Sequence, residues 1–268
     1  MQSIALRHLK DGDEVGLVPT MGALHDGHVS LIDKSVRNDD ITVVSIFVNP
    51  TQFGPKEDYL KYPRPFDKDA EICRKNHVDY LFAPSANDMF PPAHKTFVEV
   101  QTMQDVLCGR FRKGHFRGVA TVVSKLFNIV MPERAYFGMK DFQQLKIIER
   151  MTKDLNVRTK IVACPIVREK DGLALSSRNS YLSPQERKAA AGISKILKES
   201  SKRFNGKNKV SVLSAAIGKL GKIPGSKIDY VEILDFATLS VPDMNSKKFV
   251  LAAAVWIGKT RLIDNVSL

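Results

Sequence analysis

The sequence predicts an α/β protein with an open parallel sheet, followed by a smaller α+β unit on an antiparallel sheet. Short apolar runs alternate with amphipathic stretches over the first 165 or so residues, which is typical of successive β-α-β units. After residue 167 the chain becomes rich in Asp, Gly and Ser, and three more apolar runs follow two helical stretches. With 268 residues the chain is long enough for two modest cores. We therefore expect one domain over residues 1–166 and a second over residues 167–268.

Hydrophobic periodicity gives the elements of the first domain in order. Strands are expected at 15–20, 41–48, 80–83, 135–137 and 159–164, and helices at 28–37, 67–75, 119–130 and 141–155.

The second domain begins with a strong helix-start signal. Ser183 fits the N-cap, Pro184 the first helical position, and Glu186 the residue that completes a capping box, so a helix should run from here toward residue 202. A weaker helix is expected near 211–220. Apolar runs at 228–234, 249–256 and 261–266 then predict an antiparallel sheet.

Composition excludes several classes of protein. Hydrophobic residues make up 43% and charged residues 26%, which is ordinary for a globular chain and excludes wholesale disorder. Cys73, Cys108 and Cys164 are odd in number and widely spaced, which argues against a disulfide framework or a thiolate zinc site. No apolar run approaches the roughly 18 residues of a membrane span, and the N-terminus lacks a signal-peptide core. We expect a cytoplasmic protein with no membrane partner.

The charge is unevenly distributed. Residues 1–134 contain 17 basic and 17 acidic residues, whereas residues 135–268 contain 24 and 12, so the net charge of +12 belongs to the second half. A basic half suits nucleic acid, an anionic nucleotide or a solvated lysine-rich face. Aromatic residues are few there, and no helix-turn-helix, RNP or zinc-finger spacing is present. We therefore expect no nucleic acid partner.

The most distinctive segment is residues 19–28, PTMGALHDGH, at the end of the first strand and the start of the first helix. Ligands of open parallel sheets bind at this edge. Gly22 and Gly27 permit close backbone approach, and the helix start offers free N–H groups to a phosphate. His25 and His28 can face the same phosphate, as imidazolium or as neutral donors; the alternative is that they only cap the helix. The spacing matches neither a P-loop nor GxGxxG.

Two further loops follow strands at the same edge of the sheet. In FVNPTQF, Asn49 and Gln52 suit the hydroxyl and carboxylate groups of a small substrate, although such residues alone are more often turn residues. In FGMKDFQQ, Lys140 can contact phosphates, Asp141 can hold Mg²⁺ through water, and Gln144 lies one turn into the helix. The alternative for this loop is a helix N-cap beside a solvated lysine.

The fourth segment lies at the expected domain junction. Ser176 and Ser177 place two hydroxyls beside Arg178, a combination that can clamp a triphosphate and the pyrophosphate that leaves from it. His115, in GHFRG, either joins this site from a loop or has a structural role.

Taken together, these segments resemble the pantoate–β-alanine ligase (pantothenate synthetase) family. PTMGALHDGH, FVNPTQF, YPR, GHFRGV, FGMKDFQQL and DGLALSSRN occur in the family's order and spacing over nearly the whole chain. The resemblance implies a Rossmann-like nucleotidyltransferase domain with a smaller C-terminal lid domain, assembled as a homodimer. It also implies an ATP- and Mg²⁺-dependent condensation of pantoate with β-alanine through a pantoyl-adenylate, releasing pyrophosphate and then AMP.

The same resemblance implies roles for individual residues. The catalytic residues would be His25, His28, Lys140 and Arg178. The ATP site would be formed by Pro19, Thr20, Met21, Gly22, His25, Gly27, His28, Gly138, Lys140, Asp141, Val167, Leu175, Ser176, Ser177 and Arg178. Pantoate and β-alanine would contact Met21, Asn49, Gln52 and Gln144. For Mg²⁺ the candidates are Asp69 and Asp141, with binding through water and the phosphates.

Two positions depart from the family's pattern, and one related function competes with it. Met139 and Cys108 stand where the family usually has Glu, so each change removes a carboxylate. The related alternative is another HxGH nucleotidyltransferase, which would move a nucleotide onto a phosphorylated acceptor. The two glutamines, and the absence of extra arginines near FVNPTQF, favour an acceptor that carries a carboxylate.

Overall fold

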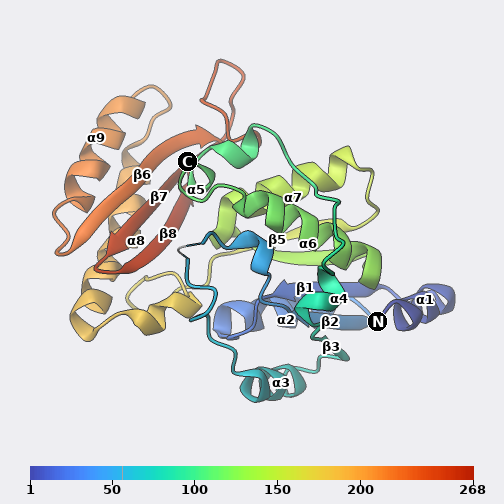
Figure 1. Ribbon diagram of the computed structural model, residues 1–268. Helices are drawn as coiled ribbons and strands as arrows, with labels where there is room; N and C mark the ends of the chain where they lie inside the picture. Colours follow the sequence, from blue (N-terminus) through green and yellow to red (C-terminus); the bar gives the residue numbers. More distant parts are fainter. Residues whose placement is uncertain (56) are drawn as a thin grey trace.

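A computed structural model describes residues 1–55 and 57–268 and contains two sheets (Figure 1). The first has the order β3-β2-β1-β4-β5 with all strands parallel. Its strands are β1 (Val15–Thr20), β2 (Ile41–Ile46), β3 (Tyr80–Phe82), β4 (Arg134–Gly138) and β5 (Lys160–Cys164). The strand order reverses between β1 and β4. The carboxyl ends of these two strands therefore flank the crevice in which such sheets bind ligands.

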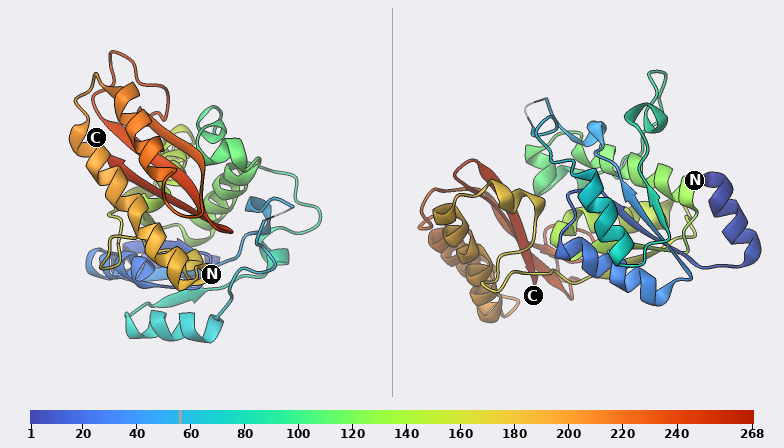
Figure 2. Two further views of the ribbon diagram at one scale, coloured as in Figure 1. Left: turned by 90° about the vertical axis from the view of Figure 1, so that its left-hand side faces the viewer. Right: turned by 90° about the horizontal axis from the view of Figure 1, so that it is seen from below.

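Helices cover both faces of the parallel sheet (Figures 1 and 2). Val18 and Val44 pack in a cluster with residues of α2 (Asp26–Asn38) and α3 (Phe66–Lys75). Their neighbours Leu17 and Val43 point the opposite way and pack in a cluster with residues of α6 (His115–Val130) and α7 (Phe142–Asp154). This arrangement explains why the strands are apolar on both faces.

Short elements complete the first part of the chain. They are α1 (Gln2–Asp11), α4 (Ala86–Met89), α5 (Cys108–Phe111) and the 3₁₀ turns η1 (Pro50–Gln52), η2 (Met103–Asp105) and η3 (Met139–Asp141). The sequence did not predict α1, which buries only Ala5 and ends at Gly12 with a φ of 84°. Its larger apolar side chains contribute little to the core, because Leu6 and Leu9 are each 47% exposed.

The second sheet is antiparallel and has the order β6-β7-β8. It consists of β6 (Ser226–Asp235), β7 (Phe249–Ile257) and β8 (Thr260–Ser267), and it follows η4 (Ser177–Tyr181), α8 (Pro184–Arg203) and α9 (Lys209–Leu220). Val231 and Leu251 pack in a cluster with residues of α8 and α9, which cover the outer face (Figure 1). Tyr230, Ala252 and Ala254 belong instead to the core of the first domain. The inner face of the small sheet therefore packs toward the parallel-sheet domain.

The predicted fold class is confirmed, with small shifts at element ends. The second strand ends at Ile46, two residues early, because the chain turns into η1. The helix expected at 119–130 begins at His115, directly after Gly114 with a φ of 79°. The capping box at Ser183 is present. The boundary at residues 166 and 167 stays a prediction. In the part of the chain that the structure describes, no helix has the length and apolar character needed to cross a bilayer.

Candidate active site

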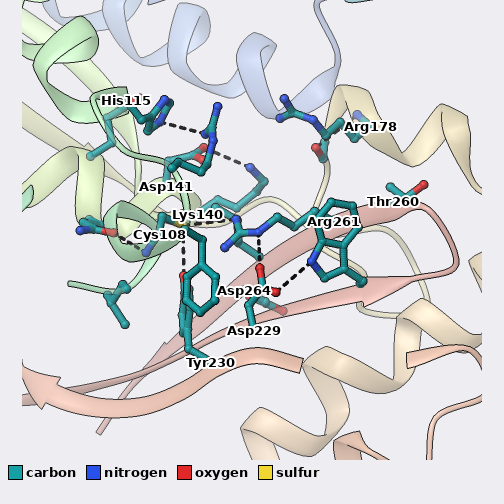
Figure 3. A pocket seen from close by; sticks show the side chains of 18 of the residues that line it. Cys108, His115, Lys140, Asp141, Arg178, Asp229, Tyr230, Thr260, Arg261 and Asp264 are labelled. Carbon is teal, nitrogen blue, oxygen red and sulfur yellow. Dashed lines mark hydrogen bonds and ion pairs between the residues drawn. The ribbon is translucent and has the colours of Figure 1, made fainter. Parts of the chain in front are cut away.

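A cavity of about 220 Å³ lies at the carboxyl ends of β1 and β4. A second cavity, of about 760 Å³, lies between the parallel-sheet domain and the small sheet (Figure 3). Lys140, Asp141 and Arg178 line both cavities. The predicted site residues that line the smaller cavity are Pro19, Thr20, Met21, His25, Gly27, His28, Asn49, Gln52, Gly138, Lys140, Asp141, Gln144, Val167, Leu175, Ser176, Ser177 and Arg178. Four segments far apart in sequence thus meet at one place. Gly22 and Asp69 are not among the residues that line either of these two cavities.

The two histidines cap α2 and are neutral. Nδ1 of His25 accepts the N–H of Gly27 at 3.1 Å, and Nδ1 of His28 accepts the N–H of His25 at 3.3 Å. Because both Nδ1 atoms accept, the hydrogen-bond network places the ring proton on Nε2. Burial, followed by the neighbouring His25 and Lys140, lowers the pKa of His28 to about 3. Burial, followed by Lys140, also lowers the pKa of His25. Of the two expected forms, the structure therefore favours neutral donors.

The shape of the histidine loop depends on Asp69 in α3. Its Oδ2 accepts the N–H of Ala23 and its Oδ1 accepts the N–H of Leu24, each at 2.8 Å. The loop needs this support because Gly22 and Ala23 both have left-handed backbones, with φ of 78° and 50°. Asp69 is 1% exposed, both of its carboxylate oxygens accept from the loop, and it lines neither cavity. This placement favours a supporting role for Asp69, and its assignment as an Mg²⁺ ligand stays a prediction.

Gly27 is required because the imidazole of His25 folds back over it. A Cβ atom at Gly27 would lie 2.8 Å from Cε1 of His25. The ring centroids of His25 and His28 are 4.1 Å apart, so any displacement of one ring also disturbs the other. The glycine therefore sets the position of both donors.

Asn49 is a support for Gln52. Its Nδ2 donates to Oε1 of Gln52 and to the carbonyl of Gly118, each at 3.0 Å, and its Oδ1 accepts from the backbone and hydroxyl of Thr51. Its amide is therefore fully used within the protein. The amide nitrogen of Gln52 lies 3.0 Å from Sδ of Met21, a weak acceptor, and can turn to a better one. Asn49 thus orients Gln52 and does not itself offer a free group to substrate.

His115 belongs to the framework of the same loop. Its Nδ1 donates to the carbonyl of Gln52 at 2.8 Å, and its Nε2 accepts from Nη1 of Arg112 at 3.0 Å. Arg112 is in turn paired with both oxygens of Glu57. Burial, followed by the charge of Arg112, lowers the pKa of His115 to about 3, so the ring is neutral. The GHFRG motif identified this histidine, but only the fold reveals that it holds the main chain of Gln52.

Lys140 and Asp141 lie in η3 at the end of β4. Nζ of Lys140 is 3.1 Å from Oδ2 of Asp141. Burial alone would raise the pKa of Asp141, but Lys140 together with Arg178 and His115 holds that pKa below its usual value. Asp141 is therefore ionised at neutral pH. Across the described residues, no cluster of three or more His, Cys, Asp or Glu side chains is suited to hold a metal by itself.

The Ser-Ser-Arg segment is held by Tyr62 and by Asp58, which the sequence did not single out. Arg178 donates through Nε and Nη2 to the two oxygens of Asp58, at 3.1 and 3.0 Å. The hydroxyl of Ser176 accepts the N–H of Arg178, and the hydroxyl of Ser177 lies 3.3 Å from that of Tyr62. The YPR motif contains Tyr62, but nothing in the sequence pairs residue 58 with residue 178. The larger cavity thus has Asp58 opposite the predicted phosphate clamp.

The two positions at which the resemblance predicts a carboxylate differ in their surroundings, which are apolar for Met139 and polar for Cys108. Met139 packs against the core of the first domain. The sulfur of Cys108 lies 3.2 Å from the hydroxyl of Tyr230 and 3.4 Å from Nη1 of Arg261 (Figure 3). Arg261 also pairs with Asp229 at 2.7 Å. This part of the larger cavity is built from β6 and β8, whose polar residues gave no motif.

A sequence profile described as Pantoate-beta-alanine ligase matches residues 1–267. The chain belongs to the pantoate–β-alanine ligase family. It is 68% identical over 268 residues to a pantothenate synthetase from Endomicrobium trichonymphae, an alignment that covers 100% of this chain and 95% of the relative. It is 53% identical to a pantothenate synthetase from Sulfurihydrogenibium sp., which it matches over 99% of this chain and 96% of the relative.

Solved structures of the pantoate–β-alanine ligase family have the same fold. A pantothenate synthetase from Thermus thermophilus superposes with a TM-score of 0.90 at 43% identity, covering 94% of this chain and 92% of that chain. A pantoate–β-alanine ligase from Francisella tularensis, complexed with beta-gamma ATP and β-alanine, has a TM-score of 0.81 at 38% identity, covering 99% and 93%. The family and the ligase function predicted from the motifs are confirmed, and the match over the whole chain favours them over another HxGH nucleotidyltransferase.

Proposed function

We propose that the chain condenses pantoate with β-alanine at the expense of ATP, through a pantoyl-adenylate bound in the cavity at the ends of β1 and β4. The observation that carries this proposal is the convergence of residues 19–28, 49–52, 138–144 and 167–178 on that cavity. They supply neutral N–H donors, two cations and amide groups around one space. An acyl-adenylation needs these groups around a triphosphate and a small hydroxy acid.

In the first step, an oxygen of the pantoate carboxylate attacks the α-phosphorus, and the bond to pyrophosphate breaks. His25 and His28 would donate Nε2–H bonds to the α-phosphate oxygens, on which negative charge grows. Lys140 and Arg178 would neutralise the leaving pyrophosphate. Because both imidazoles are already neutral donors, no proton has to move for them to act. To neutralise pyrophosphate, Arg178 would release the carboxylate of Asp58 and donate to phosphate oxygens instead.

In the second step, the neutral amine of β-alanine attacks the acyl carbon of the adenylate, and AMP leaves with the bonding electrons of the C–O bond. The proton that the nitrogen loses passes to the phosphate of AMP or to solvent. Gln52 and Gln144 would hold pantoate, with Gln52 also near β-alanine. The increase in the rate of this step comes from holding the two reactants together in one cavity. The nucleotide would be enclosed by Thr20 and Gly138, and by the remaining residues of the predicted ATP site that line the cavity.

The residues present fit a Mg²⁺ ion carried by the nucleotide. Among the described residues, Asp141 is the one carboxylate that lines the smaller cavity, and it is ionised. One carboxylate is sufficient because Mg²⁺ in nucleotide sites takes most of its ligands from phosphates and water. When bound, the ion would neutralise phosphate charge.

A homodimer and a cytoplasmic location complete the proposal. The homodimer rests on the resemblance to the family, whereas the cytoplasmic location and the lack of a nucleic acid partner rest on the composition and motif spacing of the sequence. Sedimentation equilibrium of the purified chain would test the dimer. A single species with the mass of a monomer would contradict it.

The direct experiment tests the two steps separately. The chain is incubated with ATP, Mg²⁺ and pantoate, and pyrophosphate is measured; β-alanine is then added, and AMP and pantothenate are measured. We expect pyrophosphate to depend on pantoate, and AMP release to depend on β-alanine among small amines. Pyrophosphate formation that requires a phosphorylated acceptor instead would identify a different nucleotidyltransferase.

A further inference from the structure

The last strand of the chain is directly connected to the loop that carries Lys140. Nδ2 of Asn265, on β8, donates to the carbonyl of Met139 at 2.9 Å and to the carbonyl of Lys140 at 3.0 Å. The two hydrogens of one amide group therefore hold two consecutive carbonyls of η3. Asn265 is 5% exposed and lines the larger cavity, and it pairs with Ala252, whose side chain lies on the inner face of the small sheet.

On the amino-terminal side of η3, Gly138 pairs with Cys164 in the sheet and Met139 packs against the core, but side-chain hydrogen bonds are few. Gly138 is its N-cap and gives no side-chain hydrogen bond, and Lys140 itself reaches only the neighbouring Asp141. The backbone of Lys140 is thus fixed by a donor that is 125 residues away in sequence. Any shift of β8 moves the base of the lysine side chain relative to the smaller cavity.

The residue before Asn265 fixes β8 in turn. Asp264 is 5% exposed and accepts from Nη1 and Nη2 of Arg168 at 2.7 and 2.8 Å (Asp264 is labelled in Figure 3). Arg168 opens the loop that leads into the Ser-Ser-Arg segment and also donates to the carbonyl of Gly172. Consecutive residues of one strand therefore hold both loops that supply the cations of the proposed phosphate site.

We propose that Asn265 is a positioning residue for the pyrophosphate-releasing step, acting through Lys140. The small sheet thereby contributes to the active site without touching substrate, because its amide sets where the lysine backbone lies. This inference rests on the proposed function for the role of Lys140, whereas the loop geometry is independent of it. Its physical basis is two buried hydrogen bonds. If they stabilise the transition state more than the ground state, removing both can lower the rate about tenfold.

The test is Asn265→Asp, which keeps the shape of the side chain but replaces the donating NH₂ with an oxygen that repels both carbonyls. We expect the turnover number for pantoate-dependent pyrophosphate release to fall about tenfold, with little change in the KM for pantoate. The control is Asn128→Asp on α6, an exposed asparagine that bonds only within its own helix. It should leave the turnover number within about twofold of the wild type.

Two further measurements separate positioning from a general loss of structure. In a Lys140→Ala background, Asn265→Asp should cause no further loss of turnover, since its effect passes through the lysine. Hydrogen exchange should become faster for amides around 138–144 while α8 and α9 stay protected. If Asn265→Asp does not fold, Asn265→Ala, which removes the donors without the repulsion, is measured in the same way. Losses that multiply in the two backgrounds, or unchanged turnover with unchanged exchange, would overturn the inference. Absence of pyrophosphate from the wild type would instead refute the proposed function.

Discussion

Replacing Asp69 with asparagine distinguishes its two roles, support of the histidine loop and metal binding. The carboxylate accepts the backbone N–H groups of Ala23 and Leu24, each at 2.8 Å, and is 1% exposed. Asparagine can accept only one of these bonds and turns its NH₂ group toward the other N–H. The substitution therefore leaves one N–H at the loop without an acceptor and keeps the size of the side chain.

The expected cost follows from these two bonds. A hydrogen bond to a charged group contributes about 1.5–3 kcal/mol, and a buried donor left unsatisfied costs about 1–3 kcal/mol. Burying a neutral amide costs less than burying a carboxylate, which offsets part of the loss. We expect a destabilisation of about 3 kcal/mol, which corresponds to roughly 6–12 °C in the unfolding midpoint for a chain of this size.

The assay is thermal unfolding together with the Mg²⁺ dependence of pyrophosphate release. Asp69→Asn should lower both the midpoint and the turnover number, because the loop carries His25, while the Mg²⁺ concentration for half-maximal activity stays the same. The matched control is Asp67→Asn in the exposed first turn of the same helix, which should cost less than about 1 kcal/mol. An unchanged midpoint with a raised Mg²⁺ requirement would refute our reasoning and restore Asp69 as a metal ligand.

Three other predictions follow from the site. His28→Ala should reduce turnover at least about 100-fold with ATP still bound, as expected for a transition-state donor; near-normal turnover would remove His28 from the mechanism. Gln52→Ala should raise the KM for pantoate far more than that for ATP, and equal effects on the two substrates would contradict the assignment. The pKa of His115 is about 3 in the folded chain and about 6.5 when unfolded, so below pH 6.5 the unfolded chain binds a proton that the folded chain does not. This residue should therefore lower the free energy of unfolding by about 1.4 kcal/mol per pH unit as the pH drops from 6.5 toward 5. His115→Asn should make the dependence of that free energy on pH less steep. Equal slopes for the wild type and the variant would exclude the effect.

Elements with strong local signals were predictable. The capping box at Ser183 and the apolar strands at 15–20 and 160–164 depend on residues close together in sequence, so their pattern is visible in the chain itself. The first helix was missed because its contact with the core is a single alanine, Ala5. The histidine loop was predictable as a ligand site because the strand, the glycines and the helix start are adjacent.

The roles of the supporting residues were decided only by tertiary structure. From sequence, Asn49 is a turn residue that could also bind substrate, and Asp69 is a helix N-terminal charge that could also hold a metal. In the fold, Asp69 accepts from the backbone of the histidine loop, and Asn49 donates to the side chain of Gln52 and to the carbonyl of Gly118 on α6. Whether a polar atom is free depends on what packs against it, and those neighbours come from distant parts of the chain.

The sequence alone thus determined the chain order of the strands and of the longer helices other than α1, the family, and the four loops that carry its motifs, since each is encoded in a short stretch of residues. The folded chain decided the protonation of the histidines, the pairing of Arg178 with Asp58 and the hydrogen bond from Asn265 to the loop of Lys140. These properties depend on burial and on distances between residues far apart in sequence. Such distances exist only once both sheets have packed.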